Sequence, residues 1–409
     1  MKPVTACRIC GSSSLILVVD LGWQALSGIF PREYSPESFP GGPLRLVRCV
    51  DEQGCGLVQL EQSFDPNIMY GENYGYRSGL NSSMVQHLER RVRDVEKRVK
   101  FETGEVVIDI GSNDGTTLGF FPPSLKRIGI DPTADKYRKY YPRDVVVAAD
   151  FFDSQIALSL SGGRLAKAIT SVSMMYDLEN PLNFVKDVSS VLARDGIWMF
   201  EQSYLPLMLE RFAFDTICHE HIEYYGLRQI DWLLINSGLE IIDVELNDVN
   251  GGSFAVTAAH KGVYPVTGRV EQVREREKIL WTNAASAFNT FALGARARAD
   301  VLREFVIEQI HNGKTVAGLG ASTKGNVLLQ YSGLNYESIS MIGDVNPDKL
   351  GCRTPGTWIP IVSEVEVLEQ DFDFYVVLPW HFRDFFLNSP NFERKQLVFP
   401  LPEFEIVRR

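Results

Sequence analysis

Short apolar runs alternate with stretches of helical periodicity over the central part of the chain. Residues 106–110 form a continuous β-rich run that ends in a glycine-containing turn. Further strand candidates lie at residues 126–130, 144–148, 168–172 and 196–200. Residues 84–99 carry apolar and charged positions at helical spacing, which predicts an amphipathic helix. Strands that alternate with helices predict a parallel, doubly wound sheet.

A second α/β pattern follows a long helical stretch. Apolar residues recur at helical spacing over about residues 267–311. Strand candidates then appear at residues 315–319, 339–343 and 372–378. This part of the chain is therefore expected to form a further α/β domain, with an architecture related to that of the central part.

The first part of the chain has a different character. It contains four cysteines, many Gly and Pro residues and only short apolar pieces, at residues 14–19 and 44–47. Such a segment is too small to be stabilised by a hydrophobic core alone. We therefore predict three units in an α/β protein, at residues 1–62, 63–260 and 261–409.

Composition excludes some classes of partner. The 409 residues carry a formal net charge of -11, and an acidic surface repels nucleic acid and anionic lipid. No run of about 18 apolar residues indicates a membrane span, and the first residues lack the apolar stretch of a signal peptide. A cytoplasmic protein without nucleic-acid or membrane partners is expected. The sequence does not indicate an oligomeric state.

The clustered cysteines predict a metal site. Cys7 and Cys10 form a C-x2-C pair, and Cys49 and Cys55 follow later in the chain. Four thiolates can complete a tetrahedral zinc site with no open position, so its role would be structural. The alternative is four unrelated free thiols, but clustering in a reducing compartment favours the metal.

The turn after residues 106–110 is the strongest chemical signal. It contains Asp109, Gly111, Asn113 and Asp114, and a second glycine at 115, before a helix begins. Glycine lets the backbone approach a ligand closely, and a helix N-terminus offers free N–H donors. Because the loop is lined by acids, it suits a cationic, zwitterionic ligand better than a pyrophosphate. We expect S-adenosylmethionine (SAM) here.

Two later strand ends extend this prediction. Asp131 follows the next strand, where an acid can bind both hydroxyls of a ribose. Asp150 and Phe151 follow another strand and could hold an adenine ring with a carboxylate and an aromatic face. An NAD site and a plain αβ turn are the alternatives. The ordered combination of these features favours SAM.

At this point the sequence resembles a known family, the three-domain, zinc-containing sugar C-methyltransferases of deoxysugar biosynthesis. The resemblance covers nearly the whole chain. It rests on the cysteine-rich start, the cofactor loop and five further motifs, at residues 74–79, 201–204, 218–221, 250–253 and 318–324. It implies a class I, Rossmann-like methyltransferase domain between the zinc module and a second α/β domain. It also implies SAM as methyl donor and a structural zinc.

The resemblance further implies a substrate and a set of catalytic residues. The substrate would be a 4-keto-6-deoxyhexose on a nucleoside diphosphate, methylated beside the ketone, usually at C3. His221 matches the family's histidine base, with Glu220 before it, and Tyr76 matches a tyrosine of its N-terminal motif. Histidine suits proton abstraction because its pKa lies near the working pH. Glu220 would orient this base or hold a sugar hydroxyl.

Other residues could assist this chemistry. Tyr76 or His219 could donate to the enolate oxygen. Tyr74 shares a face with Tyr76 if the segment is extended, so it is a candidate substrate contact, although a packed aromatic patch is the alternative. Two positions depart from some family members, which have tyrosine in place of Cys218 and histidine in place of Asp177. These changes concern the identity of the sugar more than the reaction.

A second metal site and plain packing are the remaining alternatives for this motif. The site would need ligands from residues 218–221, but adjacent residues on a strand point to opposite faces. The two histidines could equally be ordinary core or surface residues. Their position on either side of a glutamate argues against that.

The C-terminal part has its own candidate loop. Ser322, Thr323 and Lys324 follow a glycine-containing strand end and open a helix, which suits a diphosphate. Asp344, at the end of the next strand, could hold a sugar hydroxyl. The alternatives are an NAD site, which lacks its usual third glycine, and a purely structural domain. Trp380 and His381 could stack on a base or simply pack.

Three functions remain open at this stage. The leading one is C-methylation of a nucleotide-linked ketosugar. The second is O- or N-methylation of a sugar or other small molecule by the same fold, which needs no base beside a ketone. The third is a zinc-bearing scaffold with an inactive methyltransferase fold, which the acid-lined loop and His221 make the least favoured.

Overall fold

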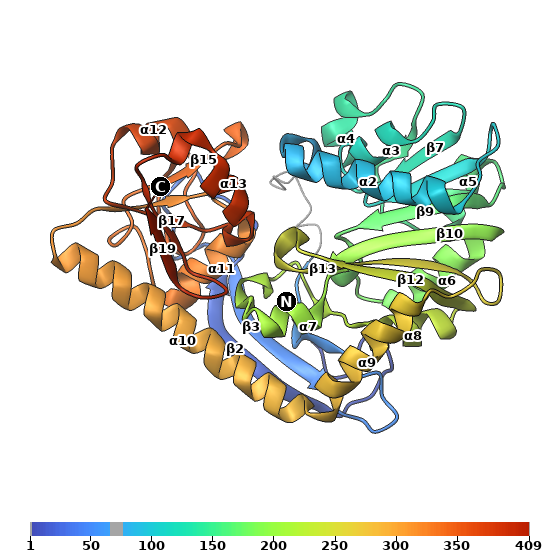
Figure 1. Cartoon of the computed structure of the whole chain (residues 1–409), viewed down its shortest axis with the longest axis horizontal. Helices are drawn as coiled ribbons and strands as arrows, with labels where there is room; N and C mark the ends of the chain where they lie inside the picture. Colours follow the sequence, from blue (N-terminus) through green and yellow to red (C-terminus); the bar gives the residue numbers. More distant parts are fainter. Residues whose placement is uncertain (1, 66–76, 409) are drawn as a thin grey trace.

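The computed structural model describes residues 2–65 and 77–408, which form two α/β lobes joined by an N-terminal sheet and a long helix (Figure 1). The central lobe is built on a 7-stranded sheet. Its strands, in spatial order, are β12 (Leu239–Asn247), β13 (Ser253–His260), β10 (Leu192–Ser203), β9 (Ala166–Val172), β6 (Val106–Ile110), β7 (Lys126–Ile130) and β8 (Val146–Ala148). The strands predicted from the apolar runs are all present here.

One feature of this sheet differs from the predicted parallel arrangement. Strand β13 runs antiparallel to both of its neighbours, β10 and β12. It follows β12 after only a short turn that contains η5 (Val249–Gly251). A connection this short can join only antiparallel strands, because a parallel pair needs a crossover of a dozen or more residues.

Helices cover both faces of the central sheet. The face under α2 (Ser82–Arg98) and α3 (Thr116–Phe120) has its own core, which includes Val92, Leu118 and Met199. The opposite face is covered by α5 (Ser154–Ser161), α6 (Pro181–Val191) and α8 (Leu227–Ile235). The remaining short elements of this part of the chain are α4 (Ala134–Tyr137), α7 (Leu205–Glu210), η1 (Ser78–Leu80), η2 (Arg138–Tyr140), η3 (Met175–Asp177) and η4 (Phe214–Thr216). A doubly wound sheet of this kind binds ligands at the carboxyl ends of its strands.

The C-terminal lobe repeats this design on a smaller scale. Its 6-stranded sheet has the order β16 (Ile361–Ser363), β15 (Ile342–Asp344), β14 (Val316–Leu319), β17 (Phe374–Val377), β18 (Gln396–Phe399) and β19 (Glu405–Arg408). Only β19 is antiparallel to its neighbour. The other elements are α11 (Thr323–Ser332), α12 (Glu364–Glu369), α13 (Arg383–Asn388), η6 (Pro347–Lys349), η7 (Trp380–Phe382) and η8 (Pro390–Phe392).

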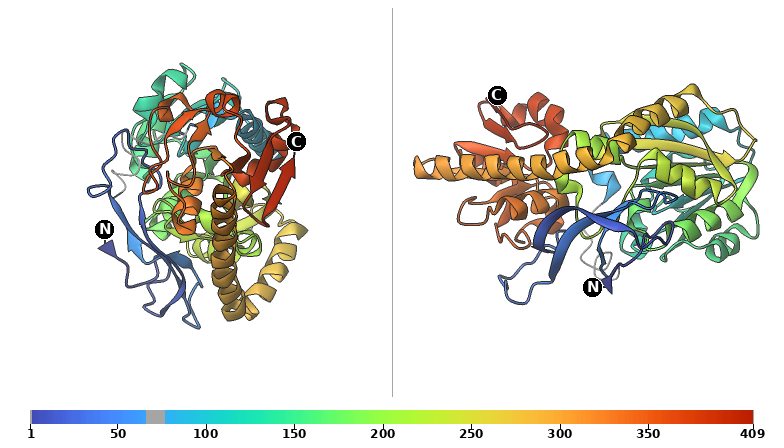
Figure 2. Two further views of the ribbon diagram at one scale, coloured as in Figure 1. Left: turned by 90° about the vertical axis from the view of Figure 1, so that its left-hand side faces the viewer. Right: turned by 90° about the horizontal axis from the view of Figure 1, so that it is seen from below.

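Two helices occupy the predicted helical stretch at residues 267–311. Helix α9 (Gly268–Thr282) is separated from α10 (Ala284–His311) by Asn283, whose φ of -111° and ψ of 24° are not helical. Helix α10 extends from the central lobe to the C-terminal lobe, as the right-hand view in Figure 2, seen from below, shows. No helix of the described residues is long and apolar enough to span a membrane.

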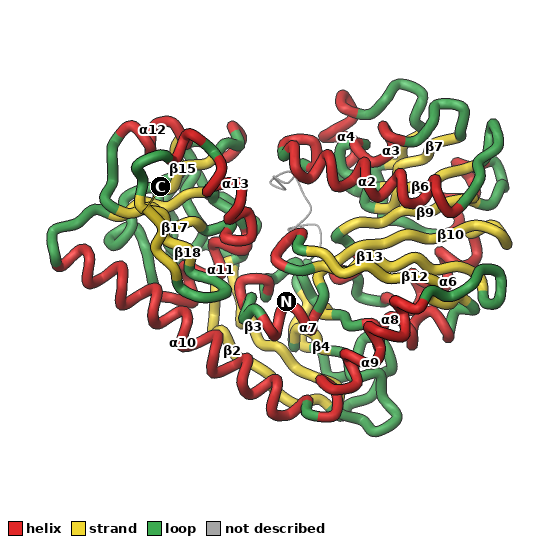
Figure 3. The backbone as a smooth tube through the Cα atoms, in the orientation of Figure 1, coloured by secondary structure: helices red, strands yellow, loops and turns green. Residues whose placement is uncertain are grey.

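The N-terminal sheet connects the two lobes. It has the order β11 (Glu223–Tyr224), β4 (Val58–Leu60), β3 (Gly41–Cys49) and β2 (Leu15–Ala25), while β1 (Lys2–Pro3) pairs with β5 (Gln62–Ser63). Its outermost member β11 comes from the middle of the chain, far from β2–β4 in sequence. The long strands β2 and β3 lie below both lobes (Figure 3). The predicted boundaries at residues 62 and 260 stay predictions, and they separate β11 from the sheet in which it lies.

Candidate active site and zinc centre

The four predicted metal ligands lie together. The sulfur atoms of Cys7, Cys10, Cys49 and Cys55 are all within 4.8 Å of one another. The Cys7 and Cys55 sulfurs are 3.4 Å apart, and those of Cys10 and Cys49 are 3.7 Å apart. A tetrahedral zinc with Zn–S bonds of about 2.3 Å separates its sulfurs by about 3.8 Å, so this cluster fits the ion. The hydrogen bond from Cys55 lowers the pKa of the Cys7 thiol to about 5, which favours the thiolate that zinc binds.

Arg8, inside the C-x2-C pair, ties the zinc centre to the rest of the protein. Its guanidinium donates to the main-chain oxygen of Leu60 at 2.8 Å and to the Ser63 hydroxyl at 2.8 Å. A longer contact of 3.4 Å reaches the main-chain oxygen of Ile222, the residue after His221. That oxygen also accepts the N–H of Leu60 at 2.9 Å. The zinc module is therefore bonded to the segment that carries the predicted base.

The predicted cofactor loop follows β6 directly. Gly111 and Asn113 both have positive φ, of 70° and 50°. A Cβ on Gly111 would meet Met174 at about 3.0–3.2 Å, so glycine is required here by conformation and by space. The Asp131 carboxylate at the end of β7 accepts the N–H of Asn113 at 2.8 Å and the N–H of Thr133 at 2.6 Å. The Thr133 hydroxyl also donates to Asp131, at 2.6 Å. Since a carboxylate has about four lone-pair positions, about one of them remains for a ribose hydroxyl.

The acids of the loop differ in surroundings. Asp109 is buried within the sheet and accepts the Thr170 hydroxyl at 2.6 Å, and burial raises its pKa to about 7. Asp109 therefore joins β6 to the neighbouring strand β9 at the start of the loop. Asp114 and Asn113 accept the N–H groups of Gly79 and Ser78, each at 2.9 Å. The loop is thus closed over by the segment that begins at residue 77.

Asp150 and Phe151 stand apart from these buried acids. Both follow strand β8 and are exposed, with half of the Phe151 side chain accessible. Asp150 contacts only the N–H of Phe151, at 2.8 Å, among the hydrogen bonds of the described residues. An exposed carboxylate beside an aromatic face at this strand end agrees with an adenine contact, which stays a prediction.

His221 has a defined tautomer. Its Nδ1 atom lies 3.0 Å from the main-chain oxygen of Thr216. A carbonyl oxygen only accepts, so Nδ1 carries the proton and Nε2 keeps a free lone pair. The ring of Tyr176 lies against the imidazole with centroids 4.2 Å apart. Burial, together with the positive charge of Lys324, lowers the pKa of His221 to about 3, so the ring is neutral at physiological pH.

The neighbours of His221 have different environments. His219 is fully buried, and its Nε2 donates to the main-chain oxygen of Gly42 at 3.3 Å while Phe64 packs on its ring. It therefore faces the N-terminal strands, which does not support its predicted contact with an enolate. Glu220 is buried, and burial raises the pKa of its carboxyl. A Cβ on Gly28 would lie 1.8 Å from the Glu220 Oε1, so the carboxyl group contacts the backbone after β2.

Residues 218–221 do not bring three potential metal ligands together in the described part of the chain. The cysteine cluster is the only group of three or more potential ligands found in residues 2–65 and 77–408. Cys218 is fully buried, and burial raises the pKa of its thiol well above the usual value.

The C-terminal loop is positioned by Asp344. Its carboxylate accepts the N–H of Ala321 at 2.7 Å and the N–H of Asn346 at 2.7 Å. The Ser322 hydroxyl caps α11 by accepting the N–H of Gly325 at 2.9 Å, and Thr323 begins that helix. The Lys324 ammonium donates to the main-chain oxygen of Asn250 in the central lobe. Lys324 therefore faces the boundary between the lobes.

Tyr74 and Tyr76 lie outside the described residues. Several functional groups were also not foreseen from the sequence: the Thr216 carbonyl, the Asp215 carboxylate, the Thr170 hydroxyl and the Arg8 guanidinium. None belongs to a local motif that signals its partner. Arg8 lies inside the predicted C-x2-C pair and Asn250 inside the motif at residues 250–253, but neither motif indicates the contact that its residue makes.

The class of protein follows from this site. An acid-lined loop after the first strand of a doubly wound sheet, with an acid closing it from the second strand, holds SAM, and a methyltransferase domain model matches residues 84–244. The cofactor of this enzyme is SAM, and its cysteine cluster holds zinc. A zinc binding domain model matches residues 7–70, and a C-methyltransferase C-terminal domain model matches residues 248–402.

The particular family is shown by a full-length relative. C-methyltransferase NovU from Streptomyces niveus is 30% identical over 426 residues, covering 100% of this chain and 98% of NovU. The protein therefore belongs to this family of C-methyltransferases and is a SAM-dependent C-methyltransferase.

Solved structures match only part of the chain. A chain of the complex between the Haloferax volcanii Trm112 methyltransferase activator and a methyltransferase is 13% identical, covers 44% of this chain and 94% of its own, and has a TM-score of 0.34. An O-methyltransferase family protein from Burkholderia thailandensis is 16% identical, covers 44% of this chain and 58% of its own, and has a TM-score of 0.34.

Proposed function

We propose that this C-methyltransferase methylates a ring carbon, C3, of a nucleotide-linked 4-keto-6-deoxyhexose, with His221 as the base, in the cytoplasm. The single observation that carries the proposal is the tautomer of His221. Its Nδ1–H is held by the Thr216 carbonyl at 3.0 Å, so Nε2 is the atom that can take a proton. An O- or N-methyltransferase needs no base beside a ketone.

The reaction we propose has two bond-making steps. The Nε2 atom of His221 removes the proton on the carbon next to the ketone, and the C–H electron pair becomes an enolate on the carbonyl oxygen. That carbon then forms a bond to the methyl group as the methyl–sulfur bond breaks, and SAM supplies the activated methyl. The proton leaves from the imidazolium to solvent, which returns His221 to its neutral form.

The environment of His221 supports the first step. The base must be neutral to accept a proton, and its low pKa keeps it so. A substrate that brings a diphosphate would offset the positive charge of Lys324 and raise the basicity of the imidazole in the complex. Tyr76, outside the described residues, is our proposed donor to the enolate oxygen. Glu220 would hold a sugar hydroxyl or orient the base.

The substrate side of the proposal uses the C-terminal loop. We assign Ser322, Thr323 and Lys324 to the diphosphate, Asp344 to a sugar hydroxyl, and Tyr74 to a further sugar contact. Lys324 donates one hydrogen bond to the Asn250 oxygen, and an ammonium has three donors. Two donors therefore remain for phosphate oxygens.

The test separates proton removal from methyl transfer. Purified enzyme is incubated with nucleotide-linked 4-keto-6-deoxyhexoses in heavy water without SAM, and exchange of the proton beside the ketone is followed by NMR. Wild type should exchange that proton, and His221→Asn should not. With SAM, mass spectrometry and NMR should place the new methyl on a ring carbon.

The matched control is His311→Asn, an exposed histidine at the end of α10. It should exchange and methylate as wild type does. Exchange that persists in His221→Asn would overturn the assignment of the base. Methylation at oxygen or nitrogen without any exchange would favour the alternative reaction, and failure to bind SAM in calorimetry would favour a scaffold without activity.

A further inference from the structure

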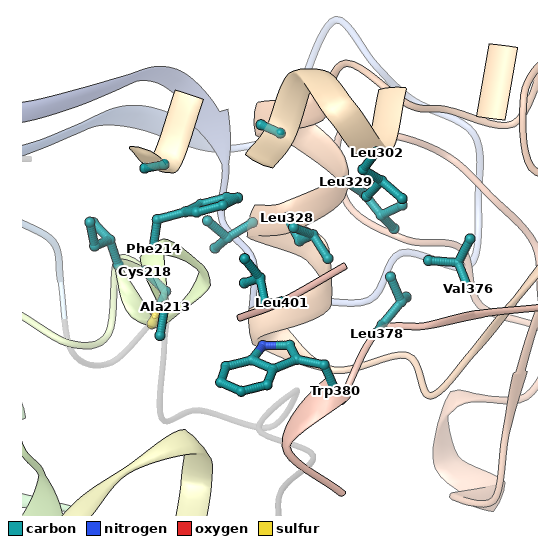
Figure 4. Close-up of a cluster of buried hydrophobic side chains, with 14 of the residues drawn as sticks. Ala213, Phe214, Cys218, Leu302, Leu328, Leu329, Val376, Leu378, Trp380 and Leu401 are labelled. Carbon is teal, nitrogen blue, oxygen red and sulfur yellow. The ribbon is translucent and has the colours of Figure 1, made fainter. Parts of the chain in front are cut away.

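The segment that carries His221 is packed into the core of the C-terminal lobe, although it comes from the central part of the chain. Ala213, Phe214, Ile217 and Cys218 belong to the same hydrophobic cluster as residues of β14, β17 and α11 (Figure 4). The ring of Phe214 lies 5.2 Å, centroid to centroid, from that of Tyr331 in α11. The conformation of this segment therefore depends on the C-terminal lobe.

One hydrogen bond joins the C-terminal lobe directly to the segment that carries His221. The indole Nε1–H of Trp380, at the carboxyl end of β17, donates to the Asp215 carboxylate at 2.8 Å. Asp215 is fully buried and Trp380 is 5% exposed, so water does not compete for this bond. The backbone at Gly251 approaches the same indole so closely that a Cβ there would lie 3.2 Å from the ring. The indole is thus fixed between two parts of the central lobe.

The bond between Trp380 and Asp215 lies next to the carbonyl group that holds His221, that of Thr216. Asp215 and Thr216 are consecutive residues of η4 (Phe214–Thr216). The Thr216 carbonyl accepts the Nδ1–H of His221 at 3.0 Å and the Tyr224 hydroxyl at 3.3 Å. The Thr216 carbonyl belongs to the Thr216–Ile217 peptide, whose N–H donates to the Phe214 oxygen at 3.0 Å. The side chain of Asp215 joins η4 to the C-terminal lobe through its bond to Trp380.

We propose that Trp380 is a positioning residue, which holds the Thr216 carbonyl through Asp215 and so fixes the tautomer of His221. The inference rests on the proposed role of His221 as the base. Trp380 touches no reacting atom in this scheme. Its loss would leave Asp215 buried without its donor, free the Thr216 carbonyl to turn, and allow the imidazole to carry its proton on Nε2. In that tautomer Nε2 cannot accept the substrate proton.

The test uses full-length Trp380→Phe, which removes the donor but keeps an aromatic ring, and Asp215→Ala, which removes the acceptor. The histidine tautomer is read by NMR on protein with 15N-labelled histidine, and His221→Asn identifies the signals of His221. Wild type should show a protonated Nδ1 and an unprotonated Nε2. Both variants should show a mixture, and proton exchange beside the ketone should fall about 10- to 100-fold.

Three comparisons distinguish positioning from general loss of structure. Asp215→Asn keeps an oxygen acceptor for the indole, so it should lose less exchange than Asp215→Ala. Trp358→Phe changes a buried tryptophan of the same lobe whose ring packs on Tyr34 and Phe39, and it should leave the tautomer unchanged. SAM affinity, measured by calorimetry, should be retained in Trp380→Phe because the cofactor loop lies on other strands.

The outcomes separate this inference from the proposed function. A His221 signal that stays in the wild-type tautomer in both Trp380→Phe and Asp215→Ala would overturn the positioning role, whatever their activity. Exchange that persists in His221→Asn would instead overturn the role of the base. If Trp380→Phe does not fold, Asp215→Ala and Asp215→Asn still compare the tautomer of His221 without and with an acceptor for the indole.

Discussion

Asp344 accepts the main-chain N–H of Ala321 at 2.7 Å, and this contact reproduces in the C-terminal lobe what Asp131 does in the central lobe. In both cases an acid after the second strand closes the loop that follows the first strand. The N–H of the residue two positions after each acid, Thr133 or Asn346, donates to the other carboxylate oxygen. Each loop is therefore held in place by hydrogen bonds within its own lobe.

This arrangement predicts the effect of Asp131→Asn. The amide would lose a charge-assisted bond to the Asn113 N–H and the strong acceptor expected for the ribose. Hydrogen bonds to charged groups contribute about 1.5–3 kcal/mol, so SAM affinity should fall about 10- to 100-fold in calorimetry. Asp135→Asn, an exposed acid of the neighbouring helix α4, is the control and should bind as wild type does. Equal affinities in the two variants would contradict the assignment.

The charge of Lys324 predicts a pH effect. A positive charge disfavours the imidazolium, and this contributes, after burial, to the lowered pKa of His221. Lys324→Met removes that charge, so the pKa of His221 should rise toward the usual value. Because only the neutral base is active, the acid limb of the kcat/KM profile should move to higher pH.

The same shift can be followed without turnover. NMR titration of His221 in the free variant should show the higher pKa directly. Lys314→Met, which changes an exposed lysine paired with Asp373, should leave both the titration and the profile where they are in wild type. A titration of His221 that Lys324→Met does not move would refute the electrostatic link.

Arg8 predicts an effect on stability. Its side chain is 3% exposed, and its contacts satisfy main-chain oxygens and the Ser63 hydroxyl. Arg8→Met should lower the free energy of unfolding by about 1–3 kcal/mol for each buried partner left unsatisfied. Arg45→Met removes a partly exposed arginine paired with Glu61 and should cost about 0–1 kcal/mol. Denaturant unfolding measures both, and a similar small loss in the two variants would show that Arg8 does not bind the module.

Zinc removal should lower the melting temperature. The cysteine cluster stabilises a module that has little core of its own, and structural zinc contributes directly to folding. Chelation, or Cys7→Ser, should lower the Tm by about 10 °C or more in calorimetry, together with loss of bound zinc. Cys352→Ser changes a buried cysteine outside the cluster and should keep the metal. A zinc-free protein with an unchanged Tm would contradict a structural role.

Much of the fold could be predicted because its signals are local. Strand β6 is a short run of mostly apolar residues, and α2 shows one apolar face, so each is visible within a few residues of sequence. The clustering of cysteines in the sequence also predicted the metal site, in which the sulfur atoms of Cys7 and Cys55 lie close together. The antiparallel direction of β13 was missed, because strand direction depends on the length of the preceding turn and not on the composition of the strand.

The interior of the site could not be predicted in the same way. Trp380 and Asp215 are far apart in the sequence, and neither residue type signals such a partner. His219 and His221 look equivalent in the sequence, yet one donates to Gly42 of the N-terminal sheet and the other to Thr216. Which of two nearby histidines is available depends on the packing of segments that come together only in the folded chain.

The shared core of the N-terminal strands and the C-terminal lobe has a consequence for synthesis of the protein. Val19 of β2 and Leu46 of β3 lie in one hydrophobic cluster with Val398 and Leu401, near the end of the chain. A chain made from its N-terminus leaves the ribosome with these strands first, whereas the helices that contact β2, α10 and α11, begin only at Ala284 and Thr323. The nascent protein therefore presents the apolar face of β2 to chaperones for most of its translation, and a ribosome that stalls before α11 is made releases a chain in which part of that face stays uncovered.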